Sequence, residues 1–297
     1  MAAKPRRRLT DDERAQRRAQ DRDRLQQAAE RLLTSDGWQQ WVRVRARNGL
    51  RRYSVGNQLL IAMQAPDATF IVGFHAWKDL GRRVCKGEHG IRILAPMPLI
   101  ERGEEPAPEP AGENSGSNVR MLFKSVAVFD IAQTEPIPGR PRLPLQPPRE
   151  PITGDSHKHL LGPLQVFASE LGYTVSRRPL DGSADGWCDP SNHQIVVNDR
   201  LPANAQVRVL VHELAHALGI GYADRGRARA EVMVDCVTFI VCGQVGLDTS
   251  GETIPYVAGW GEAGELDAIQ QDASTIDEVA RRLEAVLLED GQEQLAA

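Results

Sequence analysis

The chain has 297 residues, 41% of them apolar, and this length and composition exclude a disordered or fibrous protein and favour two globular domains. Its 36 basic and 40 acidic residues leave a net charge of −4, but the charge is unevenly spread. Residues 1–154 hold 26 basic and 18 acidic residues, a balance of +8, whereas residues 155–297 hold 10 and 22, a balance of −12. The basic half suits a polyanion such as a nucleic acid, although a basic surface can also serve solubility alone.

Cysteine usage and apolar runs indicate the compartment. The four cysteines show no CxxC spacing and are too few for a disulfide framework in a chain of this length. The sequence has no run of about 18 apolar residues, and its charged start does not lead into the apolar stretch of a signal peptide. We therefore expect a cytoplasmic protein with reduced thiols and no membrane partner.

Helical spacing of apolar residues governs the first part of the chain. Residues 1–24 are rich in charge, and we expect a basic, flexible extension there. From Leu25 apolar residues recur three and four positions apart, and Asp36 with Gly37 predicts a break. Further helices are predicted from Trp38 onward, through 57–61 after an N-cap at Ser54, and through 75–80.

Strand patterns follow these helices. A hairpin is predicted with strands at 83–85 and 91–94 around a polar turn. Strand-like sequence resumes at 119–123 and 125–129. The residues before it, 101–118, are rich in Pro, Gly and acids, so we interpret them as a loop inserted into a hairpin.

A proline-rich segment divides the chain. Residues 136–151 contain seven prolines and cannot continue a helix or a central strand, so we interpret them as an interdomain linker. This linker separates a domain at 1–135 from a domain at 152–297, and the predicted fold class is α+β for both. The second domain is predicted to contain helices at 159–171, 202–218, 229–245 and 276–288, a strand at 173–176, and a hairpin that ends in a strand at 194–198.

The strongest chemical signal is the HExxH motif His212-Glu213-Leu214-Ala215-His216 inside an aliphatic helix. Two histidines four positions apart lie on one face of a helix and can share a metal ion. Glu213 can then act as general base on a water molecule whose pKa the zinc lowers, for attack on a peptide carbonyl. The pattern arises by chance in roughly one chain in a hundred of this length, and its aliphatic setting favours a zinc site further.

A zinc ion held by two histidines needs a third protein ligand. Glu231 and Asp235 follow one turn apart on the next long helix, among apolar neighbours. We predict that Glu231 completes the ligand set and that Asp235 accepts a hydrogen bond from the far nitrogen of a ligand histidine. The alternative is an exposed pair of acids on a helix surface.

A longer motif, HExxHxxGxxH, is only partly matched. Gly219 fits, but Tyr222 stands where that motif has its third histidine. Because tyrosine is a rare zinc ligand, this difference favours a glutamate ligand from the next helix. Tyr222 and His193 could each stabilise an oxyanion, or contribute packing alone.

Longer stretches of the chain carry a resemblance to a known family. They are 57–61, 73–77, 86–88, 90–96, 128–130 and 133–135 in the first half, and 212–219, 231–241, 246–249 and 255–260 in the second. In these stretches the sequence resembles the ArdC-type antirestriction proteins of conjugative plasmids and phages. The resemblance implies an N-terminal domain that binds single-stranded DNA and a C-terminal zincin-like metallopeptidase domain. The family often has a glutamate where this chain has Asp235, which leaves open whether Glu231 or Asp235 is the third ligand.

Binding of single strands requires a positive groove and aromatic faces on which bases stack. The first half interleaves cations with Tyr53 and Trp77. Trp77 suits a helix core better than a stacking face, whereas Tyr53 suits either. Asn57 could contact DNA or cross-link the fold. The predicted DNA-contacting residues are Arg43, Arg45, Arg47, Arg51, Arg52, Tyr53, Asn57, Arg82, Arg83 and Lys86.

The sequence thus predicts a single-stranded-DNA-binding, antirestriction-type protein whose second domain is a zinc metalloendopeptidase acting on a protein substrate. Two alternatives stay open. In one, the metal is structural and the protein cleaves nothing. In the other, the peptidase cleaves a repressor or a restriction subunit and DNA only brings it to its target.

Overall fold

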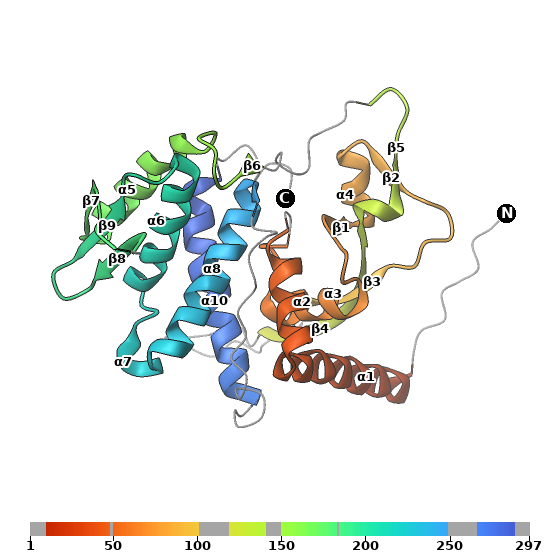
Figure 1. Ribbon diagram of the computed structural model, residues 1–297. Helices are drawn as coiled ribbons and strands as arrows, with labels where there is room; N and C mark the ends of the chain where they lie inside the picture. The colour runs from red at the N-terminus through yellow and green to blue at the C-terminus, as the bar shows by residue number, and fades with distance from the viewer. Residues whose placement is uncertain are drawn as a thin grey trace, which may run out of the picture.

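The computed structural model of the protein describes residues 10–47, 50–100, 119–140, 150–182, 184–248 and 266–288. Helices and strands are mixed along the chain, so the predicted α+β class is confirmed (Figure 1). None of the described helices combines the length and the apolar character needed to cross a bilayer.

The first helix corrects the prediction of a flexible extension over 1–24. Helix α1 spans Asp11–Glu30 and begins with a capping box, in which Thr10 accepts a hydrogen bond from the backbone of Glu13 and Glu13 accepts one from the backbone of Thr10. Charged residues suit this helix because most of its side chains face solvent. Residues 1–9 lie outside the described part of the chain.

Helix α2, Ser35–Arg45, starts earlier than its sequence suggested. The break precedes it, where the 3₁₀ turn η1, Arg31–Leu33, ends at Thr34. Thr34 caps α2 by accepting a hydrogen bond from the backbone of Gly37, which places Gly37 in the first turn instead of in the break. The next helix, α3 (Val55–Gln64), is capped by Ser54 as predicted, and α4 spans Phe74–Asp79.

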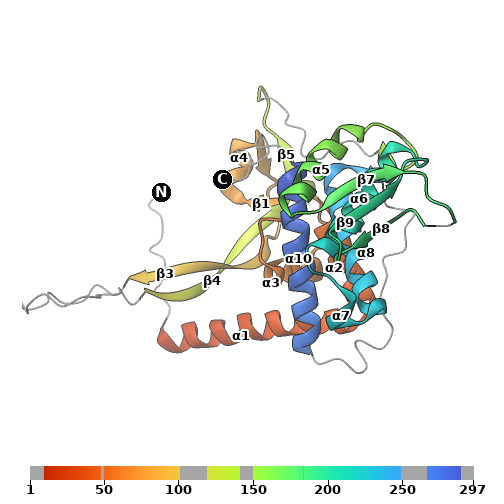
Figure 2. The same ribbon diagram turned by 90° about the vertical axis from the view of Figure 1, so that its left-hand side faces the viewer.

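An antiparallel sheet in the order β1-β4-β3 forms the strand part of the first half. Its strands are β1 (Ile71–Gly73), β3 (Ile91–Ile100) and β4 (Val119–Asp130). The pairing of β3 with β4 runs from Ile91 to Ile100, opposite Val128 to Val119, so the two strands form a hairpin. The predicted loop at residues 101–118 lies outside the described residues. The β3–β4 hairpin projects from the body of the molecule (Figure 2).

The hairpin predicted around residues 86–90 is wrong. Strand β2 (Arg82–Val84) pairs with β5 (Thr134–Pro136), and β3 pairs with β4 instead of with β2. The reason is the length of the ladder, since β4 offers β3 a partner along its full length. The turn η2, Ile131–Gln133, joins β4 to β5.

Helix α3 covers the free edge of β3. The side-chain amide of Asn57 pairs with both the backbone N–H and the backbone carbonyl of Leu94, at 2.9 and 2.8 Å. Two residues earlier on β3, the side-chain amide of Gln64 pairs in the same way with the backbone N–H and carbonyl of Arg92. Two helix side chains thus satisfy the edge groups that a further strand would otherwise pair with.

The second half consists of a small mixed sheet and long helices. The sheet has the order β7-β9-β8, and β8 and β9 form the predicted hairpin. The elements are β6 (Glu150–Pro151), η3 (Lys158–Leu160), α5 (Leu161–Glu170), β7 (Thr174–Arg178), β8 (Gly186–Asp189), β9 (Gln194–Asn198), α6 (Ala203–Ala217), α7 (Tyr222–Arg225), α8 (Arg227–Val245), β10 (Leu247–Asp248) and α10 (Leu266–Leu287).

One hydrophobic core joins the two halves. Trp41 of α2 belongs to the same cluster of buried side chains as Leu214 of α6, Val237 of α8 and Ile276 of α10. The helices of both halves accordingly lie side by side around α8 and α10 (Figure 1). The segment 136–151 therefore links two parts of the chain that share a core; residues 141–149 of it lie outside the described residues.

A buried charge cluster ties the halves together as well. Arg45 of α2 is fully buried and forms ion pairs with Asp277 at 2.6 Å and Glu284 at 2.7 Å, both on α10. Gln58 of α3 adds a hydrogen bond to Asp277 at 3.0 Å. Burial disfavours the charged guanidinium, but the two carboxylates outweigh this and raise the pKa of Arg45, so its charge persists.

Candidate metal centre and nucleic-acid interface

Helix α6 places the HExxH histidines on one face. It begins after Pro202, is buried along most of its length by aliphatic residues, and is followed by Gly219, whose φ of 106° ends it. His212 and His216 lie one turn apart, with ring centroids 5.2 Å from each other. His216 is buried and His212 is partly exposed, so the pair opens toward the surface.

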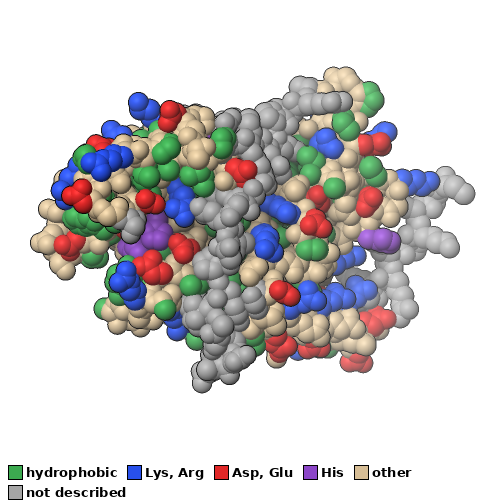
Figure 3. Space-filling view, in the orientation of Figure 1, with side chains coloured by type: hydrophobic (Ala, Val, Ile, Leu, Met, Phe, Trp, Pro, Cys, Tyr) green, Lys and Arg blue, Asp and Glu red, His purple; other side chains and the backbone are tan. Residues whose placement is uncertain are grey.

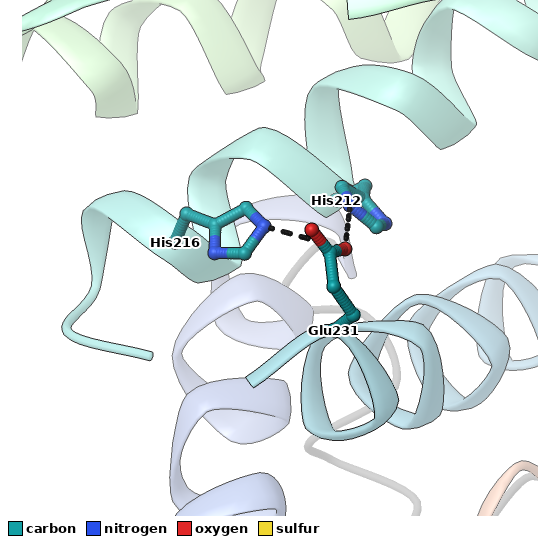
Figure 4. Close-up of side chains that lie close together, drawn as sticks. All are labelled: His212, His216 and Glu231. Atoms are coloured by element: carbon teal, nitrogen blue, oxygen red, sulfur yellow. Dashed lines mark ion pairs between the residues drawn. The ribbon is translucent and has the colours of Figure 1, made fainter. Parts of the chain in front are cut away.

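Glu231 of α8 points between these two imidazoles (Figure 4). Its Oε2 lies 3.5 Å from Nε2 of His212 and 3.9 Å from Nε2 of His216. The three groups offer ligand atoms that all lie within 4.8 Å of one another. Among the residues that the structure describes, these three form the one cluster of this kind, and they are the three residues for which a metal was predicted.

The other ring nitrogens of the histidines have partners of their own. Nδ1 of His212 lies 3.3 Å from Oδ1 of Asp235, and Nδ1 of His216 lies 2.8 Å from the carbonyl oxygen of Ile220. Both partners are acceptors, so each favours a proton on Nδ1 and leaves the Nε2 lone pair facing Glu231. This is the supporting arrangement predicted for Asp235. The carbonyl of Ile220 was not foreseen.

The histidine pKa values follow these surroundings. Burial lowers the pKa of His212, but its hydrogen bond to Asp235 and the charges of Glu213 and Glu231 outweigh burial and raise it overall. Burial lowers the pKa of His216, and the neighbouring His212 lowers it further, against the opposing effect of Ile220. The neutral form required of a metal ligand is thus favoured at His216.

Tyr222 and Arg227 hold the other oxygen of Glu231. The Tyr222 hydroxyl donates to Oε1 at 2.7 Å, and Nε of Arg227 lies 3.8 Å from the same atom. The Tyr222 ring also packs edge-on against His216, with centroids 5.2 Å apart. Burial and the hydrogen bond to Glu231 raise the pKa of Tyr222 to about 12, so the hydroxyl keeps its proton. The sequence offered no sign of this contact beyond the placement of Tyr222 after the motif.

Glu213 is buried against strand β8. Burial raises the pKa of its carboxyl to about 7; His212 opposes this rise and Glu231 adds to it. The strand can approach because Gly186 has no side chain: a Cβ there would lie 2.5 Å from Val209 and 3.3 Å from Oε1 of Glu213. Gly186 is therefore part of the site, and it was missed by sequence reasoning.

The cluster is accessible from solvent. Figure 3 shows histidine side chains at the surface beside acidic ones, over the region where α6, α7 and α8 meet in Figure 1. His193, considered from the sequence as an oxyanion stabiliser, lies in the β8–β9 turn with φ of 50° and packs against the ring of Tyr173.

Among the predicted DNA-contacting residues, Arg45 is a correction. Its guanidinium is fully buried and satisfied by Asp277 and Glu284, so it cannot reach a nucleic acid. The side-chain amide of Asn57 is engaged within the fold, because it donates to the backbone carbonyl of Leu94 and accepts from the backbone N–H of Leu94. Of the two roles considered for Asn57, the structure shows cross-linking of the fold.

Several other residues of this set make contacts within the fold. Arg47 donates to the carbonyls of Pro66 and Ala68, and Arg52 and Tyr53 both donate to the carbonyl of Ile71. Arg82 bonds to Thr134, Arg83 pairs with Glu135 at 2.8 Å, and Arg43 donates to Gln39. DNA contact remains a prediction for all of these, and for Arg51 and Lys86.

Comparisons with known proteins support the resemblance inferred from the sequence. Residues 20–129 match a family described as the N-terminal domain of anti-restriction factor ArdC. The fold is similar to the metal-free crystal structure of antirestriction protein ArdC from plasmid R388, with a TM-score of 0.53 and 19% identity over 92% of this chain and 97% of that one. The Mn(II)-bound structure of the same protein gives a TM-score of 0.46 and 17% identity, covering 92% of this chain and 98% of that one. The chain is thus ArdC-like in its N-terminal sequence and in its fold.

A curated relative is similar in sequence over a long stretch of this chain. The uncharacterized protein pXO2-81 of Bacillus anthracis is 26% identical over 256 residues, which cover 75% of this chain and 43% of that protein. The chain therefore spans less than half the length of this relative.

Proposed function

We propose that this chain is an ArdC-type antirestriction protein that binds single-stranded DNA through its N-terminal half and is a zinc-dependent endopeptidase in its C-terminal half. The observation that carries the proposal is the convergence of two imidazoles and one carboxylate on a single point. Two nitrogens and one oxygen form the donor set of catalytic zinc sites that keep a further position open.

The residues of the cluster fit a divalent metal in their chemistry. Both Nε2 atoms are directed at Oε2 of Glu231, and both Nδ1 atoms have acceptors that fix the tautomer. A metal ion would also explain why two Nε2 lone pairs face one carboxylate oxygen, because these electron-rich atoms repel one another unless a cation or a proton lies between them.

Each residue then has a distinct role. His212, His216 and Glu231 would hold the metal, while Asp235 and the carbonyl of Ile220 orient the imidazoles. A bound zinc polarises a substrate carbonyl and lowers the pKa of a water molecule. Glu213, next to the first ligand and buried against β8, accepts the proton at its carboxylate and returns it to the leaving amine.

The single-stranded-DNA part of the proposal is supported by the charge of the first half and by the family match over residues 20–129. Phosphate neutralisation releases counterions, so affinity should fall steeply with salt. The full chain should bind a labelled oligothymidylate more tightly than a duplex of equal length. Replacing Arg51 with glutamine should lower the slope of log affinity against log salt by about 1 if this residue contacts one phosphate.

The peptidase part is tested by incubating candidate proteins with the zinc-loaded chain, with and without single-stranded DNA, and analysing the products by mass spectrometry. Glu213→Gln is the matched control because it keeps every proposed ligand and removes only the proton acceptor. Cleavage by the wild type and not by Glu213→Gln supports the proposal. If Glu213→Gln retains metal and every biological activity, a structural, non-hydrolytic metal site replaces it.

A further inference from the structure

The open face of the β3–β4 hairpin carries exposed aromatic rings. In this sheet, residues directly opposite each other in antiparallel strands point to the same face. Phe123 lies opposite Pro96, Ser125 opposite Leu94, and Ala127 opposite Arg92. Phe123, Ser125, Ala127 and Phe129 therefore share one face of β4, since they alternate along the strand. We refer to this side of the sheet, with Phe74 at its base, as the Phe74–Phe123 face.

Phe74 stands at one end of this face and Phe123 at the other. Phe74 follows β1 and packs edge-on against Phe129, with ring centroids 6.0 Å apart. Phe123 lies six residues before Phe129 on β4, which corresponds to about 20 Å of extended strand. Phe74 is 46% exposed and Phe123 is 60% exposed, so both rings offer a free surface that the core does not use. Each exposed ring is a flat surface on which a base can stack, and both rings lie on the same side of the sheet.

The charges on this face favour a polyanion. Arg92 is exposed between the two rings, and Nζ of Lys78 lies 6.0 Å from the Phe74 ring centroid. The paired segments 91–97 and 123–129 contain no acidic residue. An unpaired strand of DNA presents both of the groups that such a face can bind, bases for the rings and phosphates for the cations.

We infer that single-stranded DNA crosses the Phe74–Phe123 face, with bases stacked on Phe74 and Phe123 and phosphates near Lys78 and Arg92. This inference rests on the proposed function and gives it a location. It differs from the contacts expected from the sequence, in which Tyr53 was the aromatic residue, since the Tyr53 hydroxyl donates to the carbonyl of Ile71. Duplex DNA keeps its bases stacked inside and cannot use the rings in this way.

The same hairpin supplies a matched control. Met97 is 41% exposed and lies opposite Leu122, on the other face of the hairpin from Phe123. Replacing Met97 with alanine removes a similarly exposed apolar side chain from the same element and leaves the Phe74–Phe123 face intact.

The test measures the affinity of the full chain for oligothymidylate and for an abasic deoxyribose-phosphate strand of equal length. Each stacked base contributes about 1–3 kcal/mol, so Phe74→Leu and Phe123→Leu should each weaken oligothymidylate binding by about five- to a hundredfold. Affinity for the abasic strand, and the salt slope, should not change. Met97→Ala should bind both strands as the wild type does, and thermal midpoints should confirm that all variants fold.

The outcomes separate this inference from the proposed function. Wild-type binding to oligothymidylate with no loss in the Phe74→Leu/Phe123→Leu double variant overturns the Phe74–Phe123 face and leaves DNA binding standing. An equal loss for oligothymidylate and the abasic strand also overturns it, because the rings then act without stacking. If the wild type binds neither strand, both this inference and the single-stranded-DNA part of the proposed function are overturned. If the double variant binds both strands as the wild type does but no longer binds a protein that the wild type binds, the Phe74–Phe123 face is a protein-binding surface and the inference is overturned.

Discussion

Tyr222 connects the helix after the HExxH motif to the third proposed ligand. Its hydroxyl donates to one oxygen of Glu231, while the other oxygen faces the two histidines. The hydrogen bond thus fixes which carboxylate oxygen is offered to a metal. Groups that orient a ligand in this way typically change metal affinity by about 10- to 100-fold when they are removed.

Tyr222→Phe should therefore weaken zinc binding by about tenfold or more, since it deletes the hydrogen bond to Glu231 but keeps the ring against His216. Competition with a chromogenic chelator measures the affinity. Tyr173→Phe is a suitable control because it removes a hydroxyl from the same half, in a ring that packs against His193. Equal zinc affinities in wild type and Tyr222→Phe would remove Tyr222 from the site.

At the scale of elements, helices α2 and α10 are joined by a charge cluster that the core encloses. Arg45 is fully buried, as is Glu284, and Asp277 is nearly so. Removing one member of a buried ion pair costs about 3–5 kcal/mol because its partners stay charged and unpaired. An exposed pair contributes about 0–1 kcal/mol.

Arg45→Met should lower the free energy of unfolding by about 3–5 kcal/mol, measured by urea denaturation. Arg83→Met is the matched control, since Arg83 pairs with Glu135 at the surface and should cost less than about 1 kcal/mol. The double replacement of Arg45 and Glu284 by apolar residues should recover part of the loss, because Asp277 keeps its pairing with Arg281 at 2.8 Å. Equal effects of Arg45→Met and Arg83→Met would contradict this assignment.

Strand β8 reaches Glu213 only because residue 186 is glycine. Gly186→Ala should destabilise the chain by about 1–3 kcal/mol and displace Glu213, since the new methyl would meet Val209 at 2.5 Å and the carbonyl of Val196 at 2.8 Å. Gly162→Ala, in α5, meets nothing within 4 Å and should be neutral or stabilising. Thermal unfolding of the two variants checks the difference, and similar midpoints would show that β8 yields without cost.

The elements that the sequence predicted best are those whose signal is local. The spacing of His212 and His216 within one helix, and of Glu231 and Asp235 within the next, requires only the helical repeat. Helix period also places Arg45 on the same side of α2 as Trp38 and Trp41, a sign of burial that its charge obscured. Its partners Asp277 and Glu284 lie more than 200 positions away, and no local pattern reveals them.

Strand pairing and contacts between elements were predicted less well for the same reason. The sequence around β2 and β3 contains a turn, but the choice of partner depends on β4 and β5, which follow the inserted loop. The contact of Tyr222 with Glu231 depends on how α7 sits against α8. The strand pairing and this side-chain contact both depend on tertiary packing, which the spacing of residues in the sequence does not reveal.

At the scale of the whole molecule, the basic first half and the acidic second half are not two independently packed domains. The core cluster runs from α1 and α2 through α6, α8 and α10, and the side-chain amide of Gln244 on α8 donates to the carbonyls of Arg45 and Arg47. Helix α8, which carries Glu231, thus also contacts the end of α2. The basic half and the proposed metal centre are built on common helices.

The full chain should accordingly unfold in one cooperative transition. In a variant with Trp187 and Trp260 replaced by phenylalanine, tryptophan fluorescence reports on α2 and α4 through Trp38, Trp41 and Trp77. Far-ultraviolet circular dichroism of the same variant reports on all helices. With a shared core the two signals should change at the same urea concentration. Two separated midpoints would show that the halves unfold independently and would support a division at 136–151.

The metal content of purified variants tests the proposed centre most directly. After zinc loading and dialysis, elemental analysis should find one zinc per chain in the wild type and in Glu213→Gln, and none in His212→Ala, His216→Ala or Glu231→Ala. Asp235→Ala should keep the site with an affinity lower by about 10- to 100-fold, because it orients His212 without binding the metal. Full zinc in Glu231→Ala together with loss in Asp235→Ala would exchange the two roles, and full zinc in His212→Ala and His216→Ala would contradict the site altogether.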